Sequence, residues 1–132
     1  MSVLDASLYA EALTAATPLG ESARRRLRGS GRWHAPAILP AEVASAIRGL
    51  VLGGQLTVAR AGQARARLRR SRITLHAFMP FEERVWELRT NLTVYDAWYA
   101  ALAERLGVPL VTTDARVAAA PGLQCPVDLV SP

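Results

Sequence analysis

The most constraining feature of this chain is a helix that leads into a short apolar strand, with an acidic residue near each of them. The helix is expected over 93–104, and Gly107 should end it. The strand follows at 110–111, with Asp96 in the first turn of the helix and Asp114 just beyond the strand. A helix followed by a fully apolar strand is half of a βαβ unit, which predicts a parallel sheet flanked by helices.

Short apolar strands and helices alternate along the rest of the chain as well. Further strands are expected at 3–4, 33–35, 73–77 and 127–129. Further helices are expected at 7–14, 19–28, 40–51, 57–70 and 81–88, with Gly29-Ser30-Gly31 ending the second of them. None of the strands alternates between apolar and polar residues, as is typical of strands covered on both faces. We find no internal repeat or linker, so residues 1–132 are expected to form a single α/β domain.

Four acidic residues, Asp5, Glu42, Asp96 and Asp114, lie at strand ends or in the first turns of helices. Each could have a purely structural role, because carboxylates at these positions cap helices or complement the helix dipole. If all four share one crevice at the carboxyl ends of the strands, they repel one another unless a cation neutralises them. An all-oxygen ligand set favours Mg²⁺ or Mn²⁺, which promote phosphoryl transfer without a protein nucleophile.

Charge and composition narrow the function classes. The net charge is +5, and all 16 basic residues are arginine, so an acidic partner such as a nucleic acid or an acidic protein segment is favoured. The absence of lysine argues against phosphoacceptor receiver domains and excludes Walker-type phosphate loops, and no Gly-x-Gly-x-x-Gly follows a strand. The single cysteine, the lack of a membrane-length apolar run and an N-terminus unlike a signal peptide lead us to expect a cytoplasmic protein.

Four short motifs occur in a fixed order and span nearly the whole chain. They are Leu4-Asp5-Ala6-Ser7, Pro36-x-x-x-Pro40-x-Glu42-Val43, Leu92-Thr93-x-Tyr95-Asp96-Ala97 and Leu110-Val111-Thr112-Thr113-Asp114. The ordered set resembles the PIN domains and, within them, the VapC toxins of bacterial type II toxin–antitoxin pairs. The resemblance implies a three-layer α/β/α sandwich with a central, mainly parallel sheet of short strands.

The same resemblance assigns roles to individual residues. The family's metal-binding and catalytic acids correspond to Asp5, Glu42, Asp96 and Asp114, and its supporting hydroxyl corresponds to Thr112, with Ser7 as a further helper. Members are Mg²⁺- or Mn²⁺-dependent endoribonucleases that cleave structured RNA, such as transfer or ribosomal RNA, with metal-activated water. They usually form homodimers and are neutralised by a cognate VapB-type antitoxin. The alternative is a catalytically inactive PIN-like module that binds RNA or protein, whose acids only cap helices.

Other residues carry weaker hypotheses. Arg89 and Asn91 precede the Asp96 helix and are candidates to contact RNA. The arginines at 24–28 and 65–72 could bind RNA phosphates or an acidic antitoxin segment, or could simply be solvated helix faces. Trp86 is expected to be a packing residue or a dimer contact. The remaining candidates are expected to be structural: Trp98, His34, His76 and Cys125.

Overall fold

The computed structural model describes residues 1–29 and 31–132, and is built around one five-stranded sheet. The strands are β1 (Ser2–Leu4), β2 (Trp33–Pro36), β3 (Ile73–His76), β4 (Leu110–Thr112) and β5 (Val127–Leu129). They lie in the order β3-β2-β1-β4-β5, and every neighbouring pair is parallel. The expected parallel sheet is therefore confirmed, with β1 at its centre.

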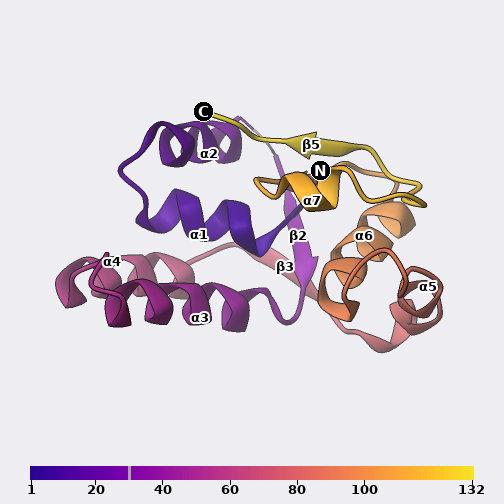
Figure 1. The fold of residues 1–132 in the computed structure, drawn as a ribbon, viewed down its shortest axis with the longest axis horizontal. Coiled ribbons are helices and arrows are strands. Elements are labelled where there is room, and N and C mark those ends of the chain that lie inside the picture. The colour runs from indigo at the N-terminus through magenta and orange to yellow at the C-terminus, as the bar shows by residue number, and fades with distance from the viewer. Residues whose placement is uncertain (30) are drawn as a thin grey trace.

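Helices cover both faces of this sheet (Figure 1). They are α1 (Ala6–Thr14), α2 (Pro18–Arg28), α3 (Leu39–Leu52), α4 (Val58–Arg69), α5 (Glu82–Glu87), α6 (Val94–Leu106) and α7 (Ala115–Ala118), with a 3₁₀ turn, η1, at Met79–Phe81. The first four helices pack against one another on one side, and α5 and α6 pack together on the other side. This arrangement is the expected three-layer α/β/α sandwich.

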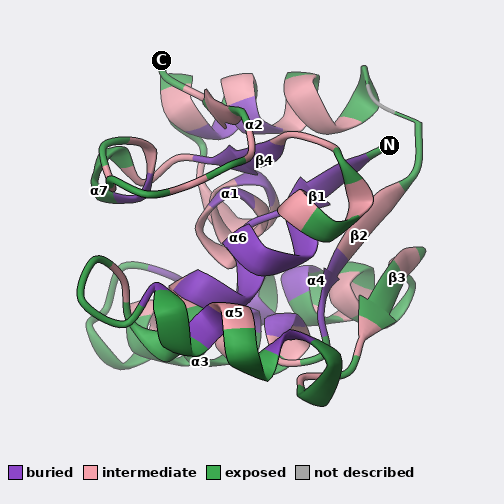
Figure 2. Cartoon of the chain, turned by 90° about the vertical axis from the view of Figure 1, so that its right-hand side faces the viewer, coloured by how far each residue is buried: buried purple, intermediate pink, exposed green. Residues whose placement is uncertain are grey.

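Helix α6 is the most deeply buried helix of the described residues, and much of it is coloured as buried in Figure 2. Its residues from Ala97 to Ala103 are all buried, and four of these seven are alanine. Small side chains let a helix approach the sheet closely, and α6 packs on β1, β2 and β4 together. The Thr93 side chain caps the first turn, and Gly107, at a φ of 67°, ends the helix in the left-handed conformation.

Most predicted elements are confirmed to within two residues, and the differences have simple causes. The helix expected from residue 19 begins one residue earlier, at Pro18, because a missing N–H is harmless at the first position of a helix. The single helix expected over 81–88 is instead η1 followed by α5, with Pro80 inside the 3₁₀ turn. The four-residue helix α7 is too short to have a periodic signal. Ser30, part of the expected stop after α2, lies outside the described residues.

No helix among the described residues is both long enough and apolar enough to cross a membrane.

Candidate active site

The centre of the candidate site is the carboxyl end of β1, next to the carboxyl end of β4. Leu4 pairs with Val111 in the parallel register, so Asp5 and Thr112 follow on neighbouring strands. Asp5 is 6% exposed, and Thr112, which is fully buried, donates its hydroxyl hydrogen to Asp5 Oδ2. The sheet itself therefore places the first acid against the hydroxyl that the sequence motif assigned to it.

Three further hydrogen bonds connect this pair with Ser7 and with the turn after β4. Ser7 Oγ donates to Asp5 Oδ2 at 3.0 Å and accepts the backbone N–H of Thr113 at 3.4 Å. The Thr112 hydroxyl accepts the backbone N–H of Asp114 at 3.0 Å. The Asp5 side chain makes no capping hydrogen bond to α1, so helix capping does not account for this acid.

Glu42 reaches the same region from the first turn of α3. Its Oε1 accepts a hydrogen bond of 2.7 Å from the hydroxyl of Tyr99, a residue of α6 that is 1% exposed. We did not predict this partner from the sequence. Tyr99 lies three residues after Asp96, a spacing that puts two side chains on the same face of a helix, and that spacing is the signal that could have revealed it.

Asp114 lies at the start of α7 and is held by Arg116. Its Oδ1 accepts the backbone N–H of Arg116 at 2.9 Å and Nε at 3.2 Å, while its Oδ2 accepts Nη2 at 2.9 Å. Asp114 thus caps α7, as one of the structural readings held, and also forms a two-point ion pair. Arg116 is a second site residue missed by the sequence, because a basic side chain two residues after an acid has no distinctive pattern.

The charges of these acids act on one another. Burial raises the pKa of Asp5, against the hydrogen bonds from Thr112 and Ser7, and the charge of Asp96 raises it further. Burial likewise raises the pKa of Glu42, with Asp5 and Asp96 adding to the shift. Burial and the charge of Asp114 raise the pKa of Asp96, which is opposed by the hydrogen bond from Thr93.

Asp114 differs from the other three acids, because its hydrogen bond with Arg116 lowers its pKa. The charge of Asp96 acts on Asp5 and on Glu42, and the charge of Asp114 acts on Asp96, so each of the four acids lies near enough to another for their charges to interact. The metal-binding and catalytic roles of the four acids stay a prediction.

In residues 1–29 and 31–132, no group of three or more Asp, Glu, His or Cys side chains is arranged as it would need to be to hold a metal ion. Three of the four acids are hydrogen-bonded to protein donors. Asp5, Glu42 and Asp114 all direct carboxylate oxygens at protein donors, namely the Thr112 hydroxyl, the Tyr99 hydroxyl and the Arg116 guanidinium. An incoming cation has to compete with these donors, above all with the positive charge of Arg116.

The other sequence candidates lie elsewhere. Asn91 donates a side-chain N–H to the carbonyl of Pro121 at 3.0 Å. The Arg89 guanidinium lies 4.8 Å from the centre of the Trp86 ring. Contact of Asn91 and Arg89 with RNA stays a prediction. Trp98 is 7% exposed and packs edge-on against Phe78, as expected for a core residue.

The two histidines, expected to be isolated structural residues, form a pair between β2 and β3. His34 Nδ1 lies 2.9 Å from His76 Nε2. The contact depends on strand pairing between residues far apart in the chain, and local spacing could not reveal it. Both side chains are partly buried, and we assign no ligand to them.

The family model of the PIN domain matches residues 2–123 of this sequence. The chain belongs to the PIN-domain family. Within that family it is similar to ribonuclease VapC9 of Mycobacterium tuberculosis, with 38% identity over 130 residues, or 98% of both chains. It is 39% identical to ribonuclease VapC12 of the same organism over 131 residues, which cover 99% of this chain and all of the relative. It is 45% identical to ribonuclease VapC1 over 101 residues, 74% of each chain. The resemblance to VapC proteins is thus confirmed.

Solved structures of PIN-domain proteins have the same fold. VapC20 of M. tuberculosis, described as a toxin that cleaves the sarcin–ricin loop, has a TM-score of 0.69 at 17% identity, covering 90% of this chain and 94% of VapC20. The FitAcB structure from Neisseria gonorrhoeae has a TM-score of 0.68 at 21% identity, covering 97% and 96% of the two chains. At these identities the similarity shows a common PIN-domain fold.

Proposed function

We propose that this PIN-domain protein is a Mg²⁺- or Mn²⁺-dependent endoribonuclease and the toxin of a VapBC-type toxin–antitoxin pair. The observation that carries the proposal is the group of four carboxylates at the carboxyl edge of the sheet, three of which have raised pKa values. Keeping several charged carboxylates close together is unfavourable, and a bound cation removes that cost. The pKa shifts of Asp5, Glu42 and Asp96 are therefore in the direction that a bound cation would reverse.

The donor chemistry of the site fits a hard divalent ion. All candidate ligands are carboxylate oxygens, which suit Mg²⁺ and Mn²⁺ better than zinc, and Asp5, Asp96, Asp114 and Glu42 would hold the ion. When bound, such an ion polarises a phosphoryl oxygen and makes water a better nucleophile at neutral pH.

The residues of the chain have separate tasks in this reaction. Thr112 and Ser7 orient the buried Asp5 carboxylate through Oδ2 and keep it in place. Tyr99 fixes Glu42 through Oε1, which leaves Oε2 available to accept a proton from the attacking water.

The substrate and partners follow from the family and from charge. Structured RNA, from the transfer or ribosomal classes, is the proposed substrate, in line with the name of VapC20 and with the net charge of +5. A VapB-type antitoxin is the proposed inhibitor, the protein is proposed to act as a homodimer, and the cytoplasm, where these RNAs occur, is its proposed location.

Metal addition tests this function against the alternative of an inactive binding module. Millimolar Mn²⁺ is expected to raise the melting temperature of the partner-free protein by several degrees, because ion at about 100 times its dissociation constant adds about 2.7 kcal/mol to the free energy of unfolding. The same protein should cut total cellular RNA into discrete fragments with Mn²⁺ or Mg²⁺ and stop when EDTA is added. Sodium chloride at equal ionic strength is the control. A binding module would show neither the metal-dependent shift nor the cleavage.

Replacing Arg116 with Gln is expected to tighten Mn²⁺ binding about fivefold, because it removes a cation that competes with the metal for Asp114. The Arg116 side chain is 89% exposed, so the free energy of unfolding without metal should change little. Isothermal titration with Mn²⁺ in the absence of RNA measures the affinity. Arg48→Gln, the same charge change on an exposed position of α3, is the control. Equal affinities in all three proteins would mean that Asp114 does not contact the ion.

A further inference from the structure

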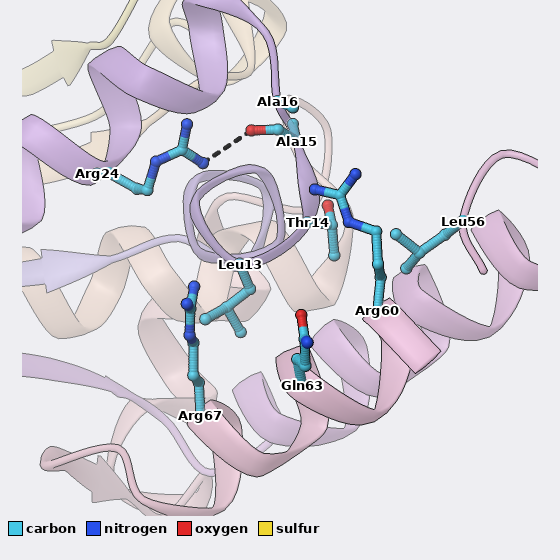
Figure 3. A pocket seen from close by; sticks show the side chains of 9 residues that line it. All are labelled: Leu13, Thr14, Ala15, Ala16, Arg24, Leu56, Arg60, Gln63 and Arg67. Atoms are coloured by element: carbon cyan, nitrogen blue, oxygen red, sulfur yellow. Dashed lines mark hydrogen bonds between the residues drawn. The ribbon is translucent and has the colours of Figure 1, made fainter. Parts of the chain in front are cut away.

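A second site candidate is a basic pocket of about 270 Å³ between the end of α1 and one face of α4 (Figure 3). Its polar lining side chains are Arg24, Arg60, Arg67, Gln63 and Thr14, and we refer to these five residues with their concave surface as the basic pocket. It unites members of both arginine clusters that the sequence analysis left without a role. None of the four acids of the active site lines it.

Helix α4 supplies most of the charge. Arg60, Gln63 and Arg67 follow one another at spacings of three and four residues, which places all three on one face of the helix. Figure 3 shows their side chains extending from α4 toward the end of α1. Within the part of the chain that the structure describes, neither Arg60 nor Arg67 has an acidic partner at ion-pair distance.

Arg24 has a different role, because its guanidinium is already engaged. It donates to the carbonyls of Ala15 at 2.7 Å and Ala12 at 3.2 Å, and weakly to Glu21 at 3.4 Å. These bonds satisfy carbonyls at the end of α1 and complement the negative end of its dipole. Arg24 therefore neutralises the negative end of α1. The charges of Arg60 and Arg67 are not needed there and remain unneutralised in a concave surface.

We propose that the basic pocket binds a backbone phosphate of the RNA substrate, away from the phosphate that is cleaved. The inference rests on the proposed ribonuclease function. Helix α1 begins directly after Asp5 and ends in the pocket, and its nine residues span about 13 Å, a distance that an RNA strand can bridge with a few nucleotides. Guanidinium groups match phosphate oxygens in a two-point geometry, and the Gln63 side chain adds a neutral donor, whereas the Thr14 hydroxyl already donates to the carbonyl of Ala10.

An acidic protein segment is the less favoured ligand, because the basic pocket offers little apolar surface. Its larger apolar side chains are Leu13 and Leu56, and the second of these is 8% exposed. The opposite side of α4, by contrast, forms a groove with α3 where Leu52 and Val58 are 69% and 78% exposed. Protein interfaces need an apolar centre, and phosphate contacts do not.

The test is the salt dependence of RNA binding by Arg60→Gln/Arg67→Gln, made in an Asp96→Asn background so that RNA is bound but not cut. If the pocket holds one phosphate, the slope of log affinity against log salt should fall in magnitude by about 0.7 to 0.9, with weaker binding at low salt. Arg69→Gln/Arg70→Gln, an identical charge change at the end of the same helix and outside the pocket lining, is the matched control. The control should lose less of the slope than the pocket variant.

Three results would overturn the proposal. The first is an equal loss of slope in both double variants, which would indicate general charge attraction. The second is unchanged RNA binding with a selective loss of binding to an acidic antitoxin segment. The third is saturable binding of inorganic phosphate that disappears in the pocket variant while the RNA slope stays the same, which would assign the pocket to free phosphate. Metal-dependent RNA cleavage by the wild-type protein tests the ribonuclease function separately, so a failure of the pocket alone is distinguishable.

Discussion

Asp96→Asn is expected to reduce RNA cleavage about a thousandfold while the protein remains folded. A divalent ion contributes several kcal/mol to stabilising the charge of a phosphoryl-transfer transition state, and about 4 kcal/mol corresponds to a thousandfold in rate. Asparagine keeps the shape of the side chain but removes the negative charge that would hold the ion. The measurement is cleavage of cellular RNA by partner-free protein with saturating Mn²⁺.

The melting temperature without metal separates a catalytic defect from a folding defect. Burial and the charge of Asp114 raise the pKa of Asp96, so an uncharged side chain there relieves repulsion, and the metal-free variant should melt no lower than the wild type. Its Mn²⁺-induced rise in melting temperature should be smaller than that of the wild type. Glu83→Gln, an exposed carboxylate on α5, is the control and should keep full activity. Equal cleavage by Asp96→Asn and the wild type would refute the proposed site.

Gly20→Ala is expected to destabilise the protein by about 2–4 kcal/mol, the largest stability effect that we predict for a one-methyl change. A Cβ at this position would lie 2.1 Å from the carbonyl oxygen of Ala15 and 2.9 Å from its carbonyl carbon, and backbone atoms cannot rotate away. The same carbonyl accepts a hydrogen bond from Arg24. The backbone N–H of Gly20 donates to the hydroxyl of Thr17, the residue that caps α2. Urea unfolding of the metal-free protein measures the change in the free energy of unfolding.

Gly49→Ala is the matched control for this substitution. Gly49 lies inside α3 and is exposed, and a Cβ added there would have no neighbouring atom within 4 Å. Alanine is the better helix former by about 1 kcal/mol, so Gly49→Ala should stabilise the protein by about 0.5–1 kcal/mol. From helix propensity alone, both substitutions would stabilise. If Gly20→Ala destabilises the protein and Gly49→Ala stabilises it, the contact between α1 and α2 determines the effect at Gly20. If both substitutions stabilise the protein, the close packing at Gly20 is contradicted.

Local sequence patterns predicted most of the elements, because their signals are short-range. The run of apolar residues in β4, the Thr93 cap and the Gly107 stop are properties of neighbouring residues, and each was found where expected. The boundary errors occurred at η1, α5 and α7, which have too few residues for periodicity to be detectable.

The sequence by itself determined the fold class and the family, for which the strand pattern and the order of the motifs were sufficient. The positions of Asp5, Glu42, Asp96 and Asp114 at element ends predict a shared site, because parallel strands bring their carboxyl ends to one edge. Only the tertiary structure decided which donors those acids meet. Three contacts depend on how elements pack against one another and on side-chain conformation. They are the hydrogen bond from Tyr99 to Glu42, the ion pair of Arg116 with Asp114 and the close approach of Gly20 to Ala15. Contacts of this kind are set by three-dimensional geometry, for which the spacing of residues along the chain has no general rule.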